Sequence, residues 1–212
     1  MSDQIRPFRV YCATSNPGKL REFSLAAQQC ATGREIEILA LPGLAEIVPC
    51  EETGTTIEDN AILKAEYYSS HGAGLVFAED SGLEASALHG APGVYSARYS
   101  GPGANAELNN RLLLQRMRGV HDREARFVCV ISLARSGRIL RTVRGVVDGF
   151  ILEEPRGTGG FGYDPLFYYP PLGCTFAELS AEKKLEISHR GRAIAALVEY
   201  LSNPDFRIQD GR

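Results

Sequence analysis

The amino-acid sequence predicts an α/β fold in which a mixed central β-sheet is flanked by helices. Up to Asp80, short β-prone runs alternate with segments of helical spacing, an order typical of parallel strands joined by helices. Between residues 125 and 147, two long β-prone runs are separated only by Ser136-Gly137, which indicates an antiparallel hairpin. A sheet with both kinds of pairing is mixed. At 212 residues, the chain suffices for one large domain, or for two lobes that share a core.

The first half of the chain holds three expected strands and two expected helices. Asn16-Pro17 is typical of a helix start, with Asn as the N-cap and Pro at the first helical position. A capping box from Thr55 to Glu58 predicts a second helix, which runs to about residue 70. Strands are expected over residues 8–14 and 35–41, and in the run that ends at Glu79.

The second half is expected to contain a turn at residues 90–93, a helix around residues 108–117, the hairpin, a long loop and a final helix. The hairpin strands are expected over residues 125–135 and 138–147, and the Gly-, Pro- and aromatic-rich loop over residues 157–171. The final helix has Ser188 as its N-cap. Its buried stripe is Ile194, Leu197, Val198 and Leu201.

The composition argues against several classes of protein. The chain has 23 Lys and Arg against 26 Asp and Glu, a net charge of −3, so we expect no nucleic-acid partner. Its five cysteines are scattered without a Cys-x-x-Cys pair, which indicates neither a zinc site nor a disulfide framework. The first residues contain no apolar signal-peptide core, and no segment is long enough to span a bilayer. We therefore expect a cytoplasmic protein without membrane contact.

The most informative segment is the apolar run that ends at Glu79-Asp80-Ser81-Gly82. Side chains alternate along a strand, so neighbouring acids inside a sheet cannot both face the core. We expect the strand to stop here and one carboxylate to project into a crevice at the edge of the sheet. A hard, oxygen-seeking cation such as Mg²⁺ would fit there. Taken alone, the segment also fits a strand that ends in a polar turn, which is the more common case.

The segment Thr14-Ser-Asn-Pro-Gly-Lys19 lies between an expected strand and an expected helix. The free N–H groups and the positive dipole end of a helix start suit a phosphate group. Gly18 allows close approach of the backbone, and Lys19 adds a cation. The spacing is not that of a Walker A loop, and strand-turn-helix joints with Asn and Gly are common, so a purely structural use stays open.

Glu51 and Glu52 precede the second helix. Acids at this place often complement the helix dipole, and they are equally suited to binding a metal ion. Asn60 and Lys64 share one face of that helix, which by itself is typical of a solvated surface.

The segment from Gly157 to Phe167 combines four glycines with aromatic residues and one acid. Ordering such a flexible segment costs conformational entropy, which binding of a ligand can offset. Aromatic rings beside a carboxylate suit a stacked nucleobase that is read along its hydrogen-bonding edge. An aromatic-packed Ω-like loop is the alternative.

Two further segments carry basic residues, Lys183-Lys184 and Ser188-His189-Arg190. His189 and Arg190 fall in the first turn of the final helix, where positive charge opposes the helix dipole. This unfavourable placement indicates an anionic or carbonyl-rich ligand, although a plain surface patch also explains it. Arg is suited to bidentate contacts with purine-like acceptors.

These segments form a series of six ordered motifs between residues 14 and 190. They are Thr14-Ser-Asn-Pro-Gly-Lys-Leu-Arg-Glu22, Glu52-Thr-Gly-Thr-Thr-Ile-Glu-Asp-Asn-Ala61 with Lys64, Glu79-Asp-Ser-Gly-Leu83, Gly90-Ala-Pro-Gly-Val-Tyr-Ser-Ala-Arg98, Gly160-Phe-Gly-Tyr-Asp-Pro165 and Ile187-Ser-His-Arg190. Together they resemble the inosine triphosphate pyrophosphatase family, the RdgB-like purine nucleoside triphosphate pyrophosphatases.

The resemblance implies a cytoplasmic, Mg²⁺-dependent homodimer. Residues 1–212 would form a single ITPase-like domain, with two lobes around a nucleotide-binding cleft. The implied reaction is hydrolysis of ITP, dITP and XTP to the monophosphate and pyrophosphate, which removes deaminated purine nucleotides from the nucleotide pool.

Motif positions imply a role for each candidate residue. Asp80 would be the catalytic proton acceptor and, with Glu52, a metal ligand, and Lys64 would assist. The phosphates would contact Thr14, Ser15, Asn16, Pro17, Gly18, Lys19 and Ser81. The base and sugar would contact Phe161, which would stack, and Gly162, Tyr163, Asp164, Lys184, His189 and Arg190.

Two departures from the family pattern bear on substrate preference. Lys183 stands where the family often has an acid before the base-site lysine, and Leu185-Glu186 replaces a small or amide residue. Two other functions stay open. A Maf-like pyrophosphatase for modified pyrimidine nucleotides is disfavoured by the Ser15-Asn-Pro-Gly-Lys19 loop. A nucleotide sensor without turnover is disfavoured by Glu52 and Asp80, because a pure binder needs no proton acceptor.

Overall fold

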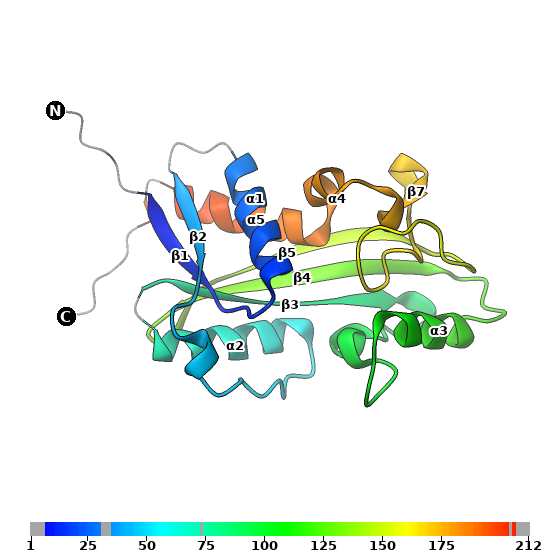
Figure 1. Cartoon of the computed structure of the whole chain (residues 1–212), viewed down its shortest axis with the longest axis horizontal. Coiled ribbons are helices and arrows are strands. Elements are labelled where there is room, and N and C mark those ends of the chain that lie inside the picture. Colours follow the sequence, from blue (N-terminus) through cyan, green and yellow to red (C-terminus); the bar gives the residue numbers. More distant parts are fainter. Residues whose placement is uncertain (1–6, 31–34, 73, 204, 207–212) are drawn as a thin grey trace.

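The computed structural model describes residues 7–30, 35–72, 74–203 and 205–206. Within these residues, seven strands form one sheet in the order β2-β1-β3-β4-β5-β6-β7, with helices on both faces (Figure 1). The strands are β1 (Phe8–Cys12), β2 (Ile36–Ala40), β3 (Val76–Ala85), β4 (Glu124–Arg135), β5 (Arg138–Ile151), β6 (Phe167–Tyr169) and β7 (Cys174–Thr175). The helices are α1 (Pro17–Gln29), α2 (Ile57–His71), α3 (Ala106–Arg116), α4 (Ala181–Ile187) and α5 (His189–Ser202), and a 3₁₀ turn spans Gly93–Arg98.

The predicted fold class, a mixed sheet flanked by helices, is confirmed. β1 pairs in parallel with β2 and with β3. From β3 onward, each strand pairs antiparallel with the next, and β4 and β5 form the hairpin expected across Ser136-Gly137. In the chain's described ranges, no helix combines the length and the apolar character needed to cross a bilayer.

β3 does not stop at the two carboxylates, so this expectation is wrong. The strand continues through Glu79 and Asp80 to Ala85, because β4 supplies an antiparallel partner along its whole length. β1, by contrast, pairs with β3 only at Val76 and Phe77. The carboxylates therefore follow directly after the point where β3 loses its parallel neighbour. They lie beside the carboxyl end of β1, the kind of position where open α/β sheets bind ligands.

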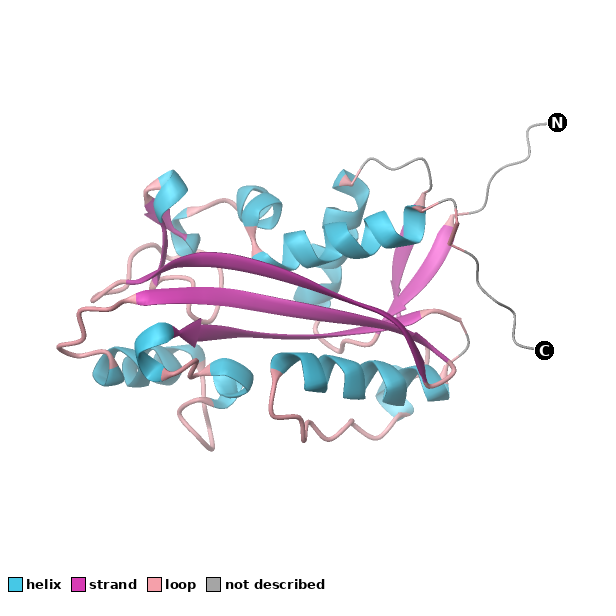
Figure 2. Cartoon of the chain, turned by 180° about the vertical axis from the view of Figure 1, so that it is seen from behind, coloured by secondary structure: helices cyan, strands magenta, loops and turns pink. Residues whose placement is uncertain are grey.

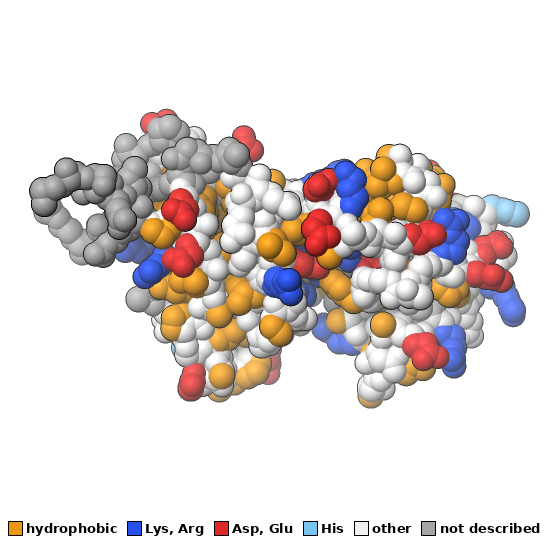
Figure 3. All heavy atoms as spheres, turned by 45° about the horizontal axis from the view of Figure 1, so that its top comes forward, with side chains coloured by type: hydrophobic (Ala, Val, Ile, Leu, Met, Phe, Trp, Pro, Cys, Tyr) orange, Lys and Arg blue, Asp and Glu red, His pale blue; other side chains and the backbone are white. Residues whose placement is uncertain are grey.

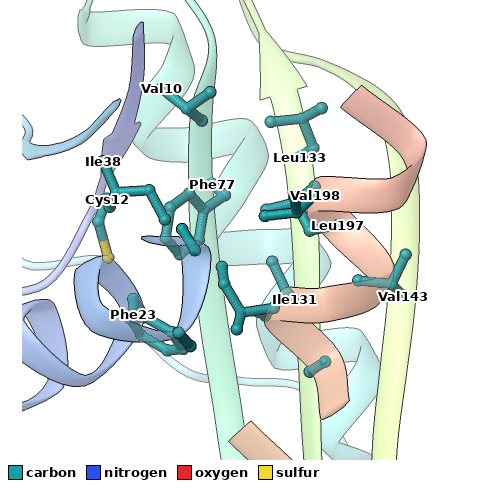
Figure 4. Packing of buried hydrophobic residues seen from close by; sticks show 14 of the residues in the cluster. Val10, Cys12, Phe23, Ile38, Phe77, Ile131, Leu133, Val143, Leu197 and Val198 are labelled. Atoms are coloured by element: carbon teal, nitrogen blue, oxygen red, sulfur yellow. The ribbon is translucent and has the colours of Figure 1, made fainter. Parts of the chain in front are cut away.

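Helices cover the two faces of the long strands in separate groups. Figures 1 and 2 show α1, α4 and α5 on one face, and α2 and α3 on the other. Under α1 and α5, Phe23, Phe77, Ile131 and Leu197 belong to one buried cluster (Figure 4). Full burial of a side chain of this size contributes about 1.5–3 kcal/mol. This packing fixes the N-terminal ends of α1 and α5 relative to β3.

Several element boundaries differ from the prediction. The Asn16 cap of α1 is confirmed, with Pro17 in the first turn. The capping box of α2 lies one residue later than expected, because the Thr56 hydroxyl pairs with Asp59 N and the Asp59 carboxylate with Thr56 N. β1 is shorter than predicted and β5 longer, and β6, β7 and α4 were not expected.

Candidate active site

The candidate site begins with the opposite orientation of Glu79 and Asp80 on β3. Phe77 and Leu83 lie two residues before Glu79 and four after it, and they belong to two separate apolar clusters. Glu79 and Ser81 therefore form a polar strip between two apolar clusters. Asp80 projects toward α2 on the other face. Adjacent residues of one strand thus place a carboxylate on each face of the sheet.

On the α2 face, Asp80 and Glu52 are brought together by Lys64. The Lys64 Nζ lies 2.9 Å from Asp80 Oδ1 and 2.9 Å from Glu52 Oε1. Arg98, from the 3₁₀ turn, lies 3.1 Å from the other oxygen of Glu52. Although Glu52 and Asp80 are far apart in sequence, they share one cation, so a positive charge fits between them.

Electrostatics differ between these two carboxylates. Burial raises the pKa of Asp80, and together with the charges of Glu52 and Glu79 it outweighs the lowering effect of the Lys64 ammonium. Burial also acts to raise the pKa of Glu52, but Lys64 and Arg98 outweigh it, so this pKa is lowered. Asp80 Oδ2 is buried and has no hydrogen-bond partner among the described residues. An unpaired carboxylate oxygen beside a second carboxylate fits a hard divalent cation, which prefers oxygen ligands.

On the α1/α5 face, Glu79 forms an ion pair with Lys19, the first lysine of α1. Its side chain is 3% exposed, and burial alone would raise its pKa. The positive charges of Lys19 and Arg190 outweigh burial and lower the pKa of Glu79 to about 2. Arg190 Nη2 donates to Ser81 Oγ at 3.1 Å, and Nη1 lies 3.6 Å from Glu22 Oε2.

The candidate phosphate loop lies at the start of α1. Asn16 Oδ1 accepts from Gly18 N at 2.8 Å and from Lys19 N at 3.2 Å, so the side chain caps two helix amides. Thr14 Oγ1 accepts from Asn16 N at 3.2 Å. Ser15, Asn16, Pro17 and Gly18 are exposed. The loop therefore caps α1, and its exposed residues are also accessible to an anion. Figure 3 shows side chains of both charge signs gathered along the narrow middle of one face.

A cavity of about 180 Å³ lies between Lys19 of α1 and the glycine-rich loop. Its lining includes Lys19, Ser81, Phe161, Gly162, Tyr163, Asp164, His189 and Arg190. Lys184 lines a neighbouring hollow on the other side of Phe161. The ring of Phe161 is half exposed, and its centroid lies 4.4 Å from Lys184 Nζ and 4.9 Å from Arg190 Cζ. The structure thus brings the sequence-predicted base-side residues together around one aromatic ring.

Asp164 and Tyr163 hold the glycine-rich loop in place. Asp164 is buried, and its Oδ2 accepts from Phe161 N at 2.8 Å and pairs with the Lys184 ammonium. The Tyr163 hydroxyl donates to Ser96 O at 2.8 Å. Burial is the main cause that raises the pKa of Tyr163, so this hydroxyl stays a donor. The loop is therefore fixed from beneath, with Phe161 at its surface.

His189 lies flat against Phe127, with ring centroids 4.7 Å apart and planes 11° from parallel. Burial, followed by the charges of Arg190 and Lys184, holds the pKa of His189 well below 6.5. The imidazole is consequently neutral at pH 7. Its Nδ1 and the Nε of Arg190 are buried polar atoms without hydrogen-bond partners in the described part of the chain. Such atoms in a cavity wall are available to a ligand.

Comparison with known proteins shows the family of this chain. The profile of the Ham1 family matches residues 10–200. The chain belongs to the Ham1 family. A relative from Acidobacterium capsulatum named dITP/XTP pyrophosphatase is 54% identical over 201 residues, which cover 91% of this chain and 97% of the relative. The resemblance inferred from the six motifs is confirmed.

Solved structures of the Ham1 family have the same fold. The HAM1 protein from Coxiella burnetii matches with a TM-score of 0.83 and 36% identity, covering 92% of this chain and 98% of that protein. The Staphylococcus aureus Ham1 protein matches with a TM-score of 0.81 and 40% identity, covering 91% of this chain and 97% of that protein.

Lys183, which departs from the family pattern, and Lys184, the base-site candidate, occupy different environments. Lys184 is buried beside Asp164, whereas Lys183 is exposed and pairs with Glu186 at 2.6 Å. Leu185 packs into the core beneath α5. Of the two lysines, Lys184 therefore lies beside Phe161, and Leu185 lines the same hollow as that ring.

Sequence reasoning missed three charged residues of this candidate site. Glu79, Glu22 and Arg98 all lie within the six motifs, but none was assigned a role. Glu79 contacts Lys19, Glu22 approaches Arg190, and Arg98 contacts Glu52. A sequence signal existed for Glu22, which follows Lys19 by three residues on α1 and so shares its helix face.

The neutral state of His189 predicts how stability depends on pH. In the unfolded chain this imidazole takes up a proton below about pH 6.5, whereas the folded protein resists protonation. Its contribution to stability is thus complete above pH 6.5 and falls as the pH decreases, by at most about 1.4 kcal/mol per pH unit. Urea unfolding at pH 7.5 and 5.5 should show a smaller difference for His189→Gln than for the wild type. His121→Gln, which replaces an exposed histidine, should keep the wild-type difference. An unchanged difference for His189→Gln would contradict this assignment.

Proposed function

We propose that this chain hydrolyses ITP, dITP and XTP to the monophosphate and pyrophosphate, and so removes deaminated purine nucleotides from the nucleotide pool. One observation carries the proposal: Lys19 and Ser81 line the same cavity as Phe161, His189 and Arg190. A nucleoside triphosphate requires cations at its phosphate end, and a stacking ring with hydrogen-bond donors at its base. The name of the Acidobacterium capsulatum relative, dITP/XTP pyrophosphatase, supports the same activity. The nucleotide would bind in a cleft between two lobes of a single domain over residues 1–212.

At the phosphate end, the residues from Thr14 to Lys19 and Ser81 contact the triphosphate. The exposed loop at the start of α1 supports this role, because a helix N-terminus attracts anions. Lys19 neutralises charge that develops on the phosphoryl oxygens during cleavage between the α- and β-phosphates. Lys64 assists from the opposite face of the sheet.

Mg²⁺ is the proposed cofactor. Glu52 and Asp80 would hold the ion, as the unpaired Oδ2 of Asp80 and the cation already shared by the two carboxylates suggest. When bound, the ion would neutralise phosphate charge and lower the pKa of a coordinated water.

Asp80 is the proposed proton acceptor for the attacking water. Its raised pKa increases its basicity, as general-base catalysis near neutral pH requires. Lys64 bonds to Oδ1, and Oδ2 has no hydrogen-bond partner among the described residues.

Base selection depends on donors around Phe161, on which the purine stacks. Arg190 and Lys184 donate to a 6-oxo group, with His189, Asp164, Tyr163 and Gly162 completing the contacts to the base and sugar. Adenine presents an amino donor instead of an oxygen, so it would leave a buried donor unpaired. Such a mismatch is costly.

The proposal predicts a specific pattern of products. Purified protein is incubated with ITP, dITP, XTP and ATP, with and without Mg²⁺, and the products are separated by ion-exchange chromatography. We expect monophosphate and pyrophosphate from the first three substrates, at rates at least about 100-fold above that for ATP, and no turnover in EDTA. Diphosphate and orthophosphate as products would contradict the assignment.

We further propose that the protein is a cytoplasmic homodimer. The five cysteines are free, which suits a reducing compartment. Val48 and Tyr95 are large exposed apolar side chains that a subunit contact could cover. Sedimentation velocity at micromolar concentration should give twice the chain mass of 23.1 kDa. A species at the single-chain mass would contradict the dimer.

A further inference from the structure

The Glu79 carboxylate is almost entirely buried beside the candidate site, yet it faces away from Asp80. Its side chain is 3% exposed and lies between α1, α5 and β4. One oxygen pairs with the Lys19 ammonium, and the other is 3.8 Å from the thiol of Cys129. The guanidinium of Arg190 acts on it electrostatically. Burying a charged carboxylate costs free energy, which nearby opposite charges must offset.

Lys19 and Arg190 both occupy unfavourable places. Each lies in the first turn of a helix, where the helix dipole repels a cation. Both side chains line the cavity of about 180 Å³, so they also repel each other. Glu79 is the carboxylate between them, and Glu22 approaches Arg190 from the other side at 3.6 Å. Two negative charges thus balance two positive charges in the free protein.

The two cations differ in how firmly they are held. Arg190 is buried and is also bound by Ser81 at 3.1 Å. The Lys19 side chain is 30% exposed, and its ammonium pairs with Glu79. If the charge of Glu79 were removed, Arg190 would keep two contacts. Lys19 would turn toward solvent, because repulsion from Arg190 would no longer be offset.

We propose that Glu79 is a positioning residue, which holds the Lys19 ammonium in the cavity for the phosphate chain while Arg190 serves the base. This inference rests on the proposed function, because it assigns Lys19 to the phosphates. Glu79 contacts neither substrate nor the attacking water and acts through Lys19. The adjacent residues Glu79 and Asp80 therefore act on opposite faces of the sheet. Glu79 positions the Lys19 ammonium on one face, and Asp80 is the proton acceptor on the other.

A double-mutant cycle tests the proposal. Glu79→Gln and Lys19→Met are made singly and together, and two quantities are measured: the Kd for ITP by calorimetry in EDTA, and kcat/KM with Mg²⁺. Glu79→Gln alone should weaken ITP binding and lower kcat/KM by roughly tenfold or more. In the Lys19→Met background the same change should cost less than about twofold, because residues that act through each other are not additive. Glu79→Asp restores the charge and should recover most of the loss.

A second carboxylate on β3 provides the control for this test. Glu84→Gln, also on β3 and paired with Arg126 at 2.6 Å, lies outside this cavity and should leave both quantities unchanged. Additive losses, or tighter ITP binding by Glu79→Gln, would overturn the proposal. If Glu79→Gln does not fold, the double variant is compared with Lys19→Met, and a further tenfold loss would overturn it. A wild type that binds ITP without turnover would refute the proposed function alone, since the binding cycle still tests Glu79. A wild type that does not bind ITP would overturn both.

Discussion

Asp80→Asn is expected to lower kcat for ITP by roughly 10³-fold or more, while the protein stays folded. General-base catalysis alone contributes about 10²–10⁴-fold, and the amide also binds a cation far less well than a carboxylate does. The substitution preserves shape, and Lys64 keeps its contact with Glu52 at 2.9 Å. Because burial already disfavours the charged form of Asp80, its neutral replacement should change stability little. Steady-state kinetics and a thermal melt check both parts.

Asp148→Asn provides a matched control for this change. Asp148 is an exposed acid on β5, in register with Arg126 of β4 and outside the candidate site. Its substitution should leave kcat within about twofold of the wild type, because surface changes of this kind rarely exceed 0.5 kcal/mol. An Asp80→Asn variant that keeps more than a tenth of the wild-type kcat would remove Asp80 from the proton-accepting role.

The segments that meet at the candidate site each have a local signal in the sequence. Asn16-Pro17 specifies a helix start through its capping chemistry, and the structure has that cap. The alternation of strands and helices, followed by the Ser136-Gly137 hairpin, specifies a mixed sheet, which is also present. These features depend on neighbouring residues, so one sequence is enough to predict them.

Features that depend on residues distant in the sequence could not be predicted from the sequence alone. The end of β3 could not be placed at Ala85, because β4, which begins at Glu124, is what prolongs it. The buried pairing of Glu79 with Lys19 depends on how α1 packs over the sheet, and the sequence shows only an acid next to another acid. Lys184 was predicted from its motif position, but its buried pairing with Asp164 depends on which side of α4 faces that residue.

Gly145→Ala is expected to destabilise the protein by about 3 kcal/mol and to lower activity by at least tenfold. Gly145 lies on β5 directly beneath the start of α5. A Cβ at this position would be 2.0 Å from His189 O and 2.6 Å from Ala193 N. Both contacted atoms are backbone, so the helix itself must shift, at the upper end of the usual cost of overpacking. His189 and Arg190 shift with it, and a misplacement of about 1 Å can cost about 10²-fold in rate.

Gly72→Ala isolates the effect of backbone contact from that of adding a methyl group. Its Cβ would come as close as 2.9 Å, but to the terminal methyl of Leu41, which can rotate away. We expect a change below about 1 kcal/mol and normal activity. Urea unfolding and kcat/KM for ITP, measured on both variants, check the contrast. Equal stability of the two variants would mean that α5 is not held against β5 at Gly145. The close approach of helix and strand would then not be what sets the position of His189 and Arg190.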